Sequence, residues 1–250
     1  MRYLITLIKK ECAEEIISSR GAAFYLVGCG VLSVFSLLLV SNTELSLLDN
    51  AQAVYMMSAI IIALALLIAV IRGSDGFAGE RERETLETLF ITPVSPVGVG
   101  IAKLMALIFS WWVVFILSIP YLWAVGSTGQ NLLPAFQYLW VAGTLLVVIF
   151  GGFTLALSAR MKTFKGALSV GLTAFLLCGS PILFGPSLRQ STVGRIIDSI
   201  NPFADALNMI DSVVVDGLGV LFQIMPLAIL VFYSIAAIWV LNMATRRVEL

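Results

Sequence analysis

Six apolar stretches, each long enough to cross a lipid bilayer, recur along the 250-residue chain. A hydrocarbon core of about 30 Å needs a helix of about 20 mostly apolar residues. Hydrophobic residues make up 60% of the chain, a composition that excludes most soluble proteins. The sequence predicts a single all-α integral membrane domain over 1–250 with six transmembrane helices. These spans lie at about 22–40, 54–71, 104–125, 139–157, 167–184 and 218–241, and none carries a charged residue away from its ends.

The basic residues are distributed unevenly between the two sides of this predicted bundle. If the N-terminus is cytoplasmic, 13 of the 15 Lys and Arg residues lie on the cytoplasmic side, and only Arg189 and Arg195 lie outside. Cytoplasmic loops of membrane proteins are enriched in Lys and Arg. We therefore expect a multi-pass protein of the prokaryotic cytoplasmic (inner) membrane, with both termini in the cytoplasm and the lipid bilayer around it. Nothing in the charge pattern indicates a nucleic-acid partner.

The first 21 residues precede the first span and show helical apolar periodicity. Leu4, Ile5, Ile8, Cys12 and Ile16 recur at the spacing of one helix face. This pattern predicts an amphipathic helix in the inner membrane interface. The alternative is a helix that packs on a soluble partner or on the protein's own inner surface. The segment lacks the features of a cleaved signal peptide.

The residue types that carry most enzyme chemistry are missing. The chain has no histidine, the commonest general base and transition-metal ligand. Its three cysteines, Cys12, Cys29 and Cys178, have no CxxC spacing and are expected to be small buried hydrophobes. No GxxxxGK[ST] phosphate-binding loop occurs. We expect no catalytic residue, metal or cofactor on this chain, which disfavours an intramembrane enzyme.

Charge is concentrated between the second and third spans, in the cytoplasmic segment 72–103. Leu86, Leu89 and Phe90 form an i, i+3, i+4 apolar patch, with Glu80, Arg83, Glu84 and Glu87 around it. The pattern predicts a short amphipathic helix. The alternative is a solvated hairpin whose charges only keep the loop out of the lipid.

Two proline positions divide this segment. Proline disfavours helical geometry in the residue before it, so Thr92-Pro93 ends the short helix. Ser95-Pro96 is typical of a helix N-cap followed by proline at the first helical position. The next helix is expected to run through Lys103 into the third span.

The motif Glu80-x-Glu82-x-x-Thr85-Leu86-x-x-Leu89-x-x-Thr92-Pro93-Val94-Ser95, followed by Lys103, is similar to a segment of ABC-2 type permeases, the membrane subunits of ATP-driven exporters. The resemblance extends to the architecture of the whole chain. Two positions depart from the pattern, because this family often has glycine where Glu84 and Ala102 stand here.

The resemblance implies that the loop helix docks on a separate ATP-binding cassette ATPase subunit, which binds ATP and Mg. Six spans are half of a typical twelve-span pathway, so a second permease copy is implied, most simply in a homodimer. The residues that the resemblance assigns to ATPase coupling are Glu80, Glu82, Arg83, Glu84, Thr85, Leu86, Glu87, Leu89, Phe90, Thr92 and Pro93.

The outer segment 185–217 contains two short helical patterns before the last span. One covers 193–199, and Asn201-Pro202 begins the other, in which Phe203, Leu207, Ile210 and Val214 share one side. These lengths resemble the re-entrant outer helices that close the exit of this exporter class. The resemblance thus implies an outer gate at Asn201, Pro202, Phe203 and Leu207. The alternative is a pair of surface helices without a gating role.

Together these patterns predict the permease subunit of an ABC exporter. Because no charge lies along the spans, a charged solute would lose hydration there without gaining a counter-ion. An apolar or amphipathic substrate is therefore expected. The rival interpretation is a membrane scaffold that anchors an ATPase and transmits force to an outer partner without moving a solute.

Overall fold

The computed structural model describes residues 2–41, 50–86, 94–127, 131–183 and 200–247. These segments contain α-helices and one 3-10 helix, and no β-strand lies within them. In chain order the elements are α1 (Arg2–Ile17), α2 (Ser19–Ser41), α3 (Asn50–Glu82), α5 (Pro96–Gly126), α6 (Leu132–Arg160), α7 (Phe164–Leu183), α10 (Pro202–Val214), η2 (Val220–Gln223) and α11 (Ile224–Thr245).

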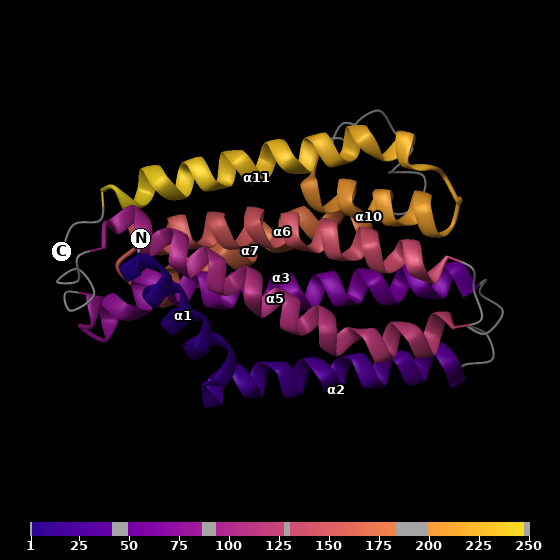
Figure 1. The fold of residues 1–250 in the computed structure, drawn as a ribbon, viewed down its shortest axis with the longest axis horizontal. Coiled ribbons are helices and arrows are strands. Elements are labelled where there is room, and N and C mark those ends of the chain that lie inside the picture. Colours follow the sequence, from indigo (N-terminus) through magenta and orange to yellow (C-terminus); the bar gives the residue numbers. More distant parts are fainter. Residues whose placement is uncertain (1, 42–49, 87–93, 128–130, 184–199, 248–250) are drawn as a thin grey trace.

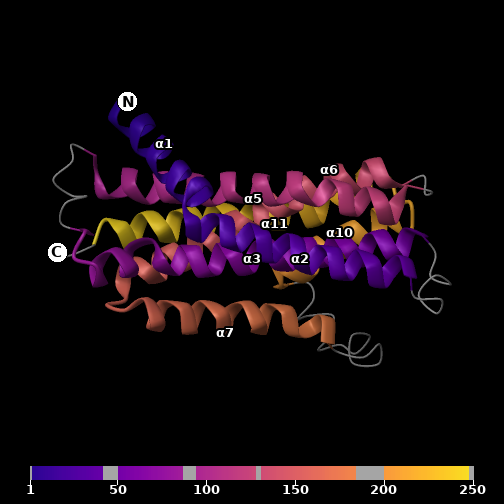
Figure 2. The ribbon, with the colours of Figure 1, turned by 90° about the horizontal axis from the view of Figure 1, so that it is seen from below.

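The long helices form a bundle with α3, α5 and α6 at its centre (Figure 1). Helices α2 and α11 lie along opposite edges of this view, and α7 stands to one side, as Figure 2 shows. Helix α1 begins, and α11 ends, at the same end of the bundle (Figure 1). We call this end the terminal end and the other the opposite end. The arrangement agrees with an even number of crossings.

Five helices among the described residues are long and apolar enough to span a membrane: α2 from Gly21, α3, α5, α6 and α11. The fifth predicted span, 167–184, coincides with α7, whose described apolar part is shorter. The prediction of an all-α, multi-pass membrane protein is confirmed. The count of six crossings stays a prediction.

Helix α3 is longer than the span predicted at 54–71, because it continues without a break to Glu82. The sequence placed Glu80 on a separate short helix, and this is wrong: Glu80 lies in the last turn of α3. The extension is stable beyond the apolar stretch because its polar groups find partners on α1, α5 and α6. Arg72, Asp75 and Glu80 each make an ion pair in this part of the chain.

The centre of the bundle depends on close approach of helices. Gly143 of α6 lies against the ring of Trp111 of α5, where an added Cβ would come within 2.2 Å of the ring. The indole Nε1 of Trp111 donates to Thr144 Oγ1 at 3.0 Å, so the buried polar atom is satisfied. Because α5 and α6 are fixed at their middle, changes in their relative position are expected mainly at their ends.

Candidate coupling site at the terminal end

A buried lysine connects three helices at the terminal end. Lys103 Nζ of α5 lies 3.0 Å from Glu11 Oε2 of α1 and 2.7 Å from Glu80 Oε1 of α3. The residues Glu11 and Lys103 are each only 6% exposed. Removing one partner of a buried ion pair leaves an uncompensated charge. This triad therefore ties the N-terminal helix and the end of α3 to α5.

A second ion pair holds α1 one turn further along the helix. Arg72 Nη1 of α3 lies 3.1 Å from Glu15 Oε2, and the Arg72 guanidinium lies 5.0 Å from the centre of the Phe24 ring. Burial raises the pKa of Glu15 above its ordinary value, while the charge of Arg72 acts in the opposite direction. Glu15 is therefore more readily protonated than an exposed glutamate.

The face of α1 that packs on the bundle overlaps the predicted apolar face, because Leu4 and Ile8 pack against the core and Cys12 and Ile16 are half-buried. Ile5, which the sequence placed on that face, is 53% exposed, whereas Leu7 is buried. The ion pairs of Glu11 and Glu15 set the rotation of the helix, since these residues are four apart and share a side. Helix α1 thus packs on its own chain, mainly against α5. Its place in the membrane interface stays a prediction.

An open polar cleft of about 320 Å³ lies between α1, α3 and α5. Acidic side chains outnumber basic ones among the residues that line it, with five carboxylates and three cationic groups. Arg83 and Asp75, at one side of the cleft, form an ion pair with Nη2 at 2.8 and 2.9 Å from the two carboxylate oxygens. The charged residues that line the cleft are Glu11, Glu14, Glu15, Asp75, Glu80, Arg72, Arg83 and Lys103.

Helix α3 ends in a tight turn at Glu84, which has a left-handed φ of 58°. The Glu84 N–H donates to the carbonyl of Arg81 at 3.1 Å, and the Thr85 N–H donates to the carbonyl of Glu80 at 3.0 Å. This pair of bonds is the Schellman arrangement, which usually has glycine at the left-handed position. Glu84 therefore occupies a position at which glycine would avoid the strain of a side chain.

The structure describes six of the predicted coupling residues. Glu82, Arg83, Glu84 and Thr85 are exposed at the terminal end, while Leu86 is only 4% exposed and packs in the core of its own chain. Glu80 is bound to Lys103, as described above. The other predicted coupling residues, Glu87, Leu89, Phe90, Thr92 and Pro93, lie outside the described residues.

The residues near this turn also contact the ends of α6 and α7. Ser158 Oγ of α6 accepts from the N–H groups of Phe77 and Ala78 at 2.9 and 2.8 Å and donates to the carbonyl of Ser74 at 2.7 Å. A side chain inserted in this way enters the hydrogen-bond ladder of α3. Arg81 Nη1 donates to the carbonyl of Met161, and Glu82 Oε1 accepts from the N–H of Phe164. The end of α3 is thus joined to both neighbouring helices.

The predicted start of α5 is confirmed. Ser95 Oγ accepts from the N–H of Gly98 at 3.2 Å, and Pro96 is the first residue of the helix. The helix then runs without interruption through Lys103 into the third span.

Toward the opposite end, α10 packs inside the bundle against α6, α11, α3 and α7. Asn201 caps it by accepting from the Phe203 N–H at 3.0 Å, which confirms the predicted cap and helix. The predicted apolar side, Phe203, Leu207, Ile210 and Val214, is fully buried. Phe203 also contacts Phe175 of α7, with ring centres 6.2 Å apart. The helix predicted at 193–199 lies outside the described residues.

Sequence reasoning missed Glu11, Glu15, Arg72 and Ser158. The i, i+4 spacing of Glu11 and Glu15 on a helix was a usable signal, because it places two acids on one side. Ser158 carries no such signal, since a serine in an apolar helix more often bonds to its own preceding turn.

An all-helical bundle with a polar network at one end and an apolar interior defines a multi-pass membrane protein without a nucleotide-binding domain among its described residues. The family model for "ABC-2 family transporter protein" matches residues 5–245. The chain belongs to this family, as an ABC-2 type permease, and is thus a membrane subunit of an ABC transporter rather than its catalytic component. Membership implies an ABC ATPase subunit as partner. Comparison with curated proteins gives no significant match.

Proposed function

We propose that this chain is the permease of an ABC exporter and that its ATPase partner docks at the terminal end, on the segment from Glu80 to Pro93. The exposed side chains of Glu82 to Thr85 are available for such a contact. The 13 to 2 bias of basic residues in the sequence favours a cytoplasmic terminal end. In this proposal α7 is the fifth of six crossings. The membrane that the chain crosses is the cytoplasmic membrane.

The observation that carries this proposal is the continuity of α3. The helix runs from Asn50 to Glu82, and it contacts α10 within the bundle as well as α5, α6 and α7. Its last turn is joined to α5 through Lys103, and the turn before it is joined to α6 through Ser158. A displacement of the docked turn would therefore act on three spans together, and α3 would carry it toward α10.

At the opposite end we assign the outer gate to Asn201, Pro202, Phe203 and Leu207. All four are buried where α10 meets α6, α7 and α11. Several span hydroxyls bond to their own preceding turn, such as Ser58 to Val54 and Thr173 to Ser169. Such hydroxyls offer no counter-charge to a solute, which supports an apolar or amphipathic cargo moved outward through a homodimer.

The deciding experiment is ATP-dependent flux in proteoliposomes that contain the chain and its ATPase. Two candidate substrates are compared in this assay: a fluorescent amphipathic lipid analogue and a charged hydrophilic dye. We expect ATP-dependent movement of the amphipathic compound alone. ATP hydrolysis without flux of any tested compound would favour the scaffold, and flux of only the charged dye would contradict the cargo assignment.

A further inference from the structure

The polar cleft at the terminal end has a buried acceptor without a partner. Glu11 is 6% exposed, and its Oε2 is bound to Lys103, but its Oε1 has no hydrogen-bond partner among the residues that the structure describes. An unsatisfied buried acceptor is unfavourable. A donor from outside the chain would satisfy this oxygen.

The charges of the cleft favour a cationic donor next to an anionic group. Five carboxylates and three cationic groups line it, and one of the carboxylates, Glu14, pairs with Lys10 outside the cleft. Glu11 and Glu80 share the single charge of Lys103, so one negative charge is left over, and an ammonium group matches it. Arg72 Nε is also buried, has no hydrogen-bond partner in the described part of the chain, and can donate to an anion. A metal ion fits less well, because the described part of the chain holds no cluster of three or more His, Cys, Asp or Glu that could bind one.

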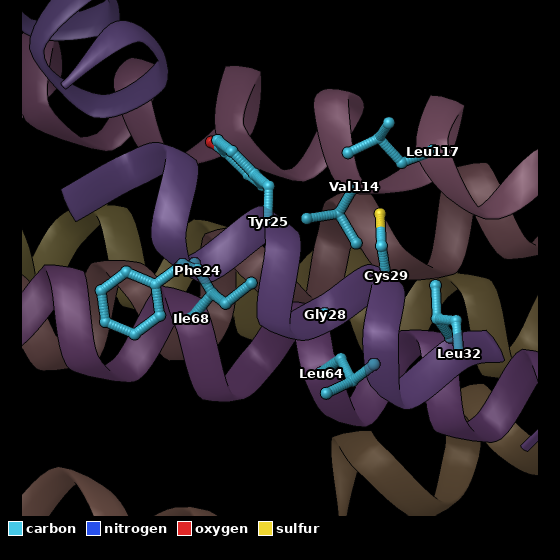
Figure 3. Close-up of a pocket in the computed structure, with 9 residues that line it drawn as sticks. All are labelled: Phe24, Tyr25, Gly28, Cys29, Leu32, Leu64, Ile68, Val114 and Leu117. Carbon is cyan, nitrogen blue, oxygen red and sulfur yellow. The ribbon is translucent and has the colours of Figure 1, made fainter. Parts of the chain in front are cut away.

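An apolar groove lies between α2, α3 and α5 (Figure 3). Phe24, Gly28 and Leu32 line it from α2, and Leu64 and Val114 line it from α3 and α5. Its enclosed volume is only about 10 Å³, so a chain-like molecule would lie along it rather than enter the bundle. From Phe24 to Leu32 the groove follows α2 for about 12 Å, at 1.5 Å per residue.

The cleft and the groove share a boundary. Arg72 lines the cleft and lies 5.0 Å above the ring of Phe24, which lines the groove. Ser18 and Ser19 line the cleft, and the apolar part of α2 begins at Gly21. The polar site therefore lies where α2 enters the bilayer, at the level of lipid headgroups.

We propose that the cleft and groove together bind one bilayer phospholipid with a primary ammonium headgroup, of the ethanolamine class. The ammonium group binds Glu11 Oε1 beside Glu15, the phosphate binds Arg72, and one acyl chain lies in the groove. This lipid binds to the outside of the bundle and is independent of the cargo, so the site is expected whether or not the chain transports a solute.

Two glycines of α2 provide a matched test of the groove. An added Cβ would meet no atom within 4 Å at Gly28 or at Gly30, so both tolerate a side chain. Only Gly28 lines the groove. Gly28→Leu should fill it, whereas Gly30→Leu should leave it open. The smaller substitution Gly28→Ala should lower lipid affinity by an intermediate amount. It replaces Gly28→Leu as the test if the leucine variant fails to fold.

The measurement is native mass spectrometry of the delipidated protein titrated with phosphatidylethanolamine, phosphatidylcholine and phosphatidylglycerol of identical chains. We expect ethanolamine lipid to bind at least about tenfold more tightly than the other two, which corresponds to about 1.4 kcal/mol. Gly28→Leu should lose at least about tenfold in affinity for all three, and Gly30→Leu should match the wild type. Equal binding by Gly28→Leu and Gly30→Leu would overturn the groove assignment.

Glu11→Gln tests the headgroup. It should remove most of the preference for ethanolamine, while Asp216→Asn, an exposed acid outside the cleft, should keep it. Glu15→Gln is the second variant if Glu11→Gln does not fold. An unchanged preference in both cleft variants would contradict the headgroup assignment. If Glu11→Gln instead releases a copurified ATPase with lipid binding intact, the cleft is a protein contact and the lipid proposal is wrong.

Discussion

The terminal end and the opposite end of the bundle are held together by different interactions. At the terminal end, α1, α3 and α5 are joined by Lys103 with Glu11 and Glu80 and by Arg72 with Glu15. Toward the opposite end, α10 is held by apolar burial along one whole side. Ion pairs are directional and can exchange partners, whereas close apolar packing resists displacement. This difference is consistent with the proposed docking of the ATPase at the terminal end and with the proposed gate at the opposite end.

The largest expected effect comes from removing the cation of the triad. Lys103→Met leaves Glu11 and Glu80 without their shared partner and should lower the free energy of unfolding by about 3–5 kcal/mol. Denaturant unfolding in detergent micelles measures it. Lys10→Met is the control, because Lys10 pairs with Glu14 at an exposed position and should change stability by less than about 0.5 kcal/mol. Equal effects of the two variants would show that the triad does not hold the terminal end.

Truncation of a packed side chain on α10, the proposed gate helix, should have the next largest effect on the free energy of unfolding. Leu207→Ala removes a fully packed side chain from α10 and should cost about 2–4 kcal/mol in the same unfolding assay. Leu218→Ala, at an exposed position after α10, should change stability by less than about 0.5 kcal/mol. If Leu207→Ala were as mild as Leu218→Ala, α10 would be loosely attached and the two ends would not differ as described.

A smaller effect, of the opposite sign, is expected at the turn that ends α3. Glu84→Gly relieves the left-handed backbone at this position and should raise the free energy of unfolding by about 0.5 kcal/mol, after the larger entropy of glycine in the unfolded chain is counted. Glu82→Gly, two residues earlier within the helix, should lower it by about 1 kcal/mol. Destabilisation by both variants would contradict the turn geometry.

The smallest effect is a pH dependence at Glu15. Because burial raises the pKa of Glu15, the folded state binds this proton more tightly than the unfolded state. Its contribution to stability is therefore complete below about pH 4.3, the ordinary pKa of a glutamate, and decreases as pH rises through the raised value. The groups around it are Arg72, Lys103, Glu11 and Asp75. Glu15→Gln should flatten the slope of unfolding free energy against pH in this window, and an identical slope in both proteins would contradict the assignment.

The fold was largely predictable because apolar length and periodicity determine where membrane helices lie. The start of α5 at Ser95-Pro96 and of α10 at Asn201-Pro202 followed from local capping chemistry, which depends on neighbouring residues only. The end of α3 did not, since its extension to Glu82 depends on Lys103 and Ser158, which are distant in the chain. The roles of Glu11 and Glu15 were missed for the same reason, because the apolar pattern of α1 does not reveal that two acids beside it face partners on other helices.

Docking of the ATPase at the terminal end is the central claim, and Leu89→Asp tests it most directly. Leu86 packs within its own chain, so a change there would mix folding with docking, and Leu89 is the better position for a charge. A charge buried in the docked contact should be unfavourable by about 2–5 kcal/mol. We predict that the ATPase copurifies with the wild type and with Leu218→Asp at the opposite end but is lost from Leu89→Asp, with membrane insertion unchanged in all three. Equal recovery of the ATPase with Leu89→Asp and the wild type would contradict the account.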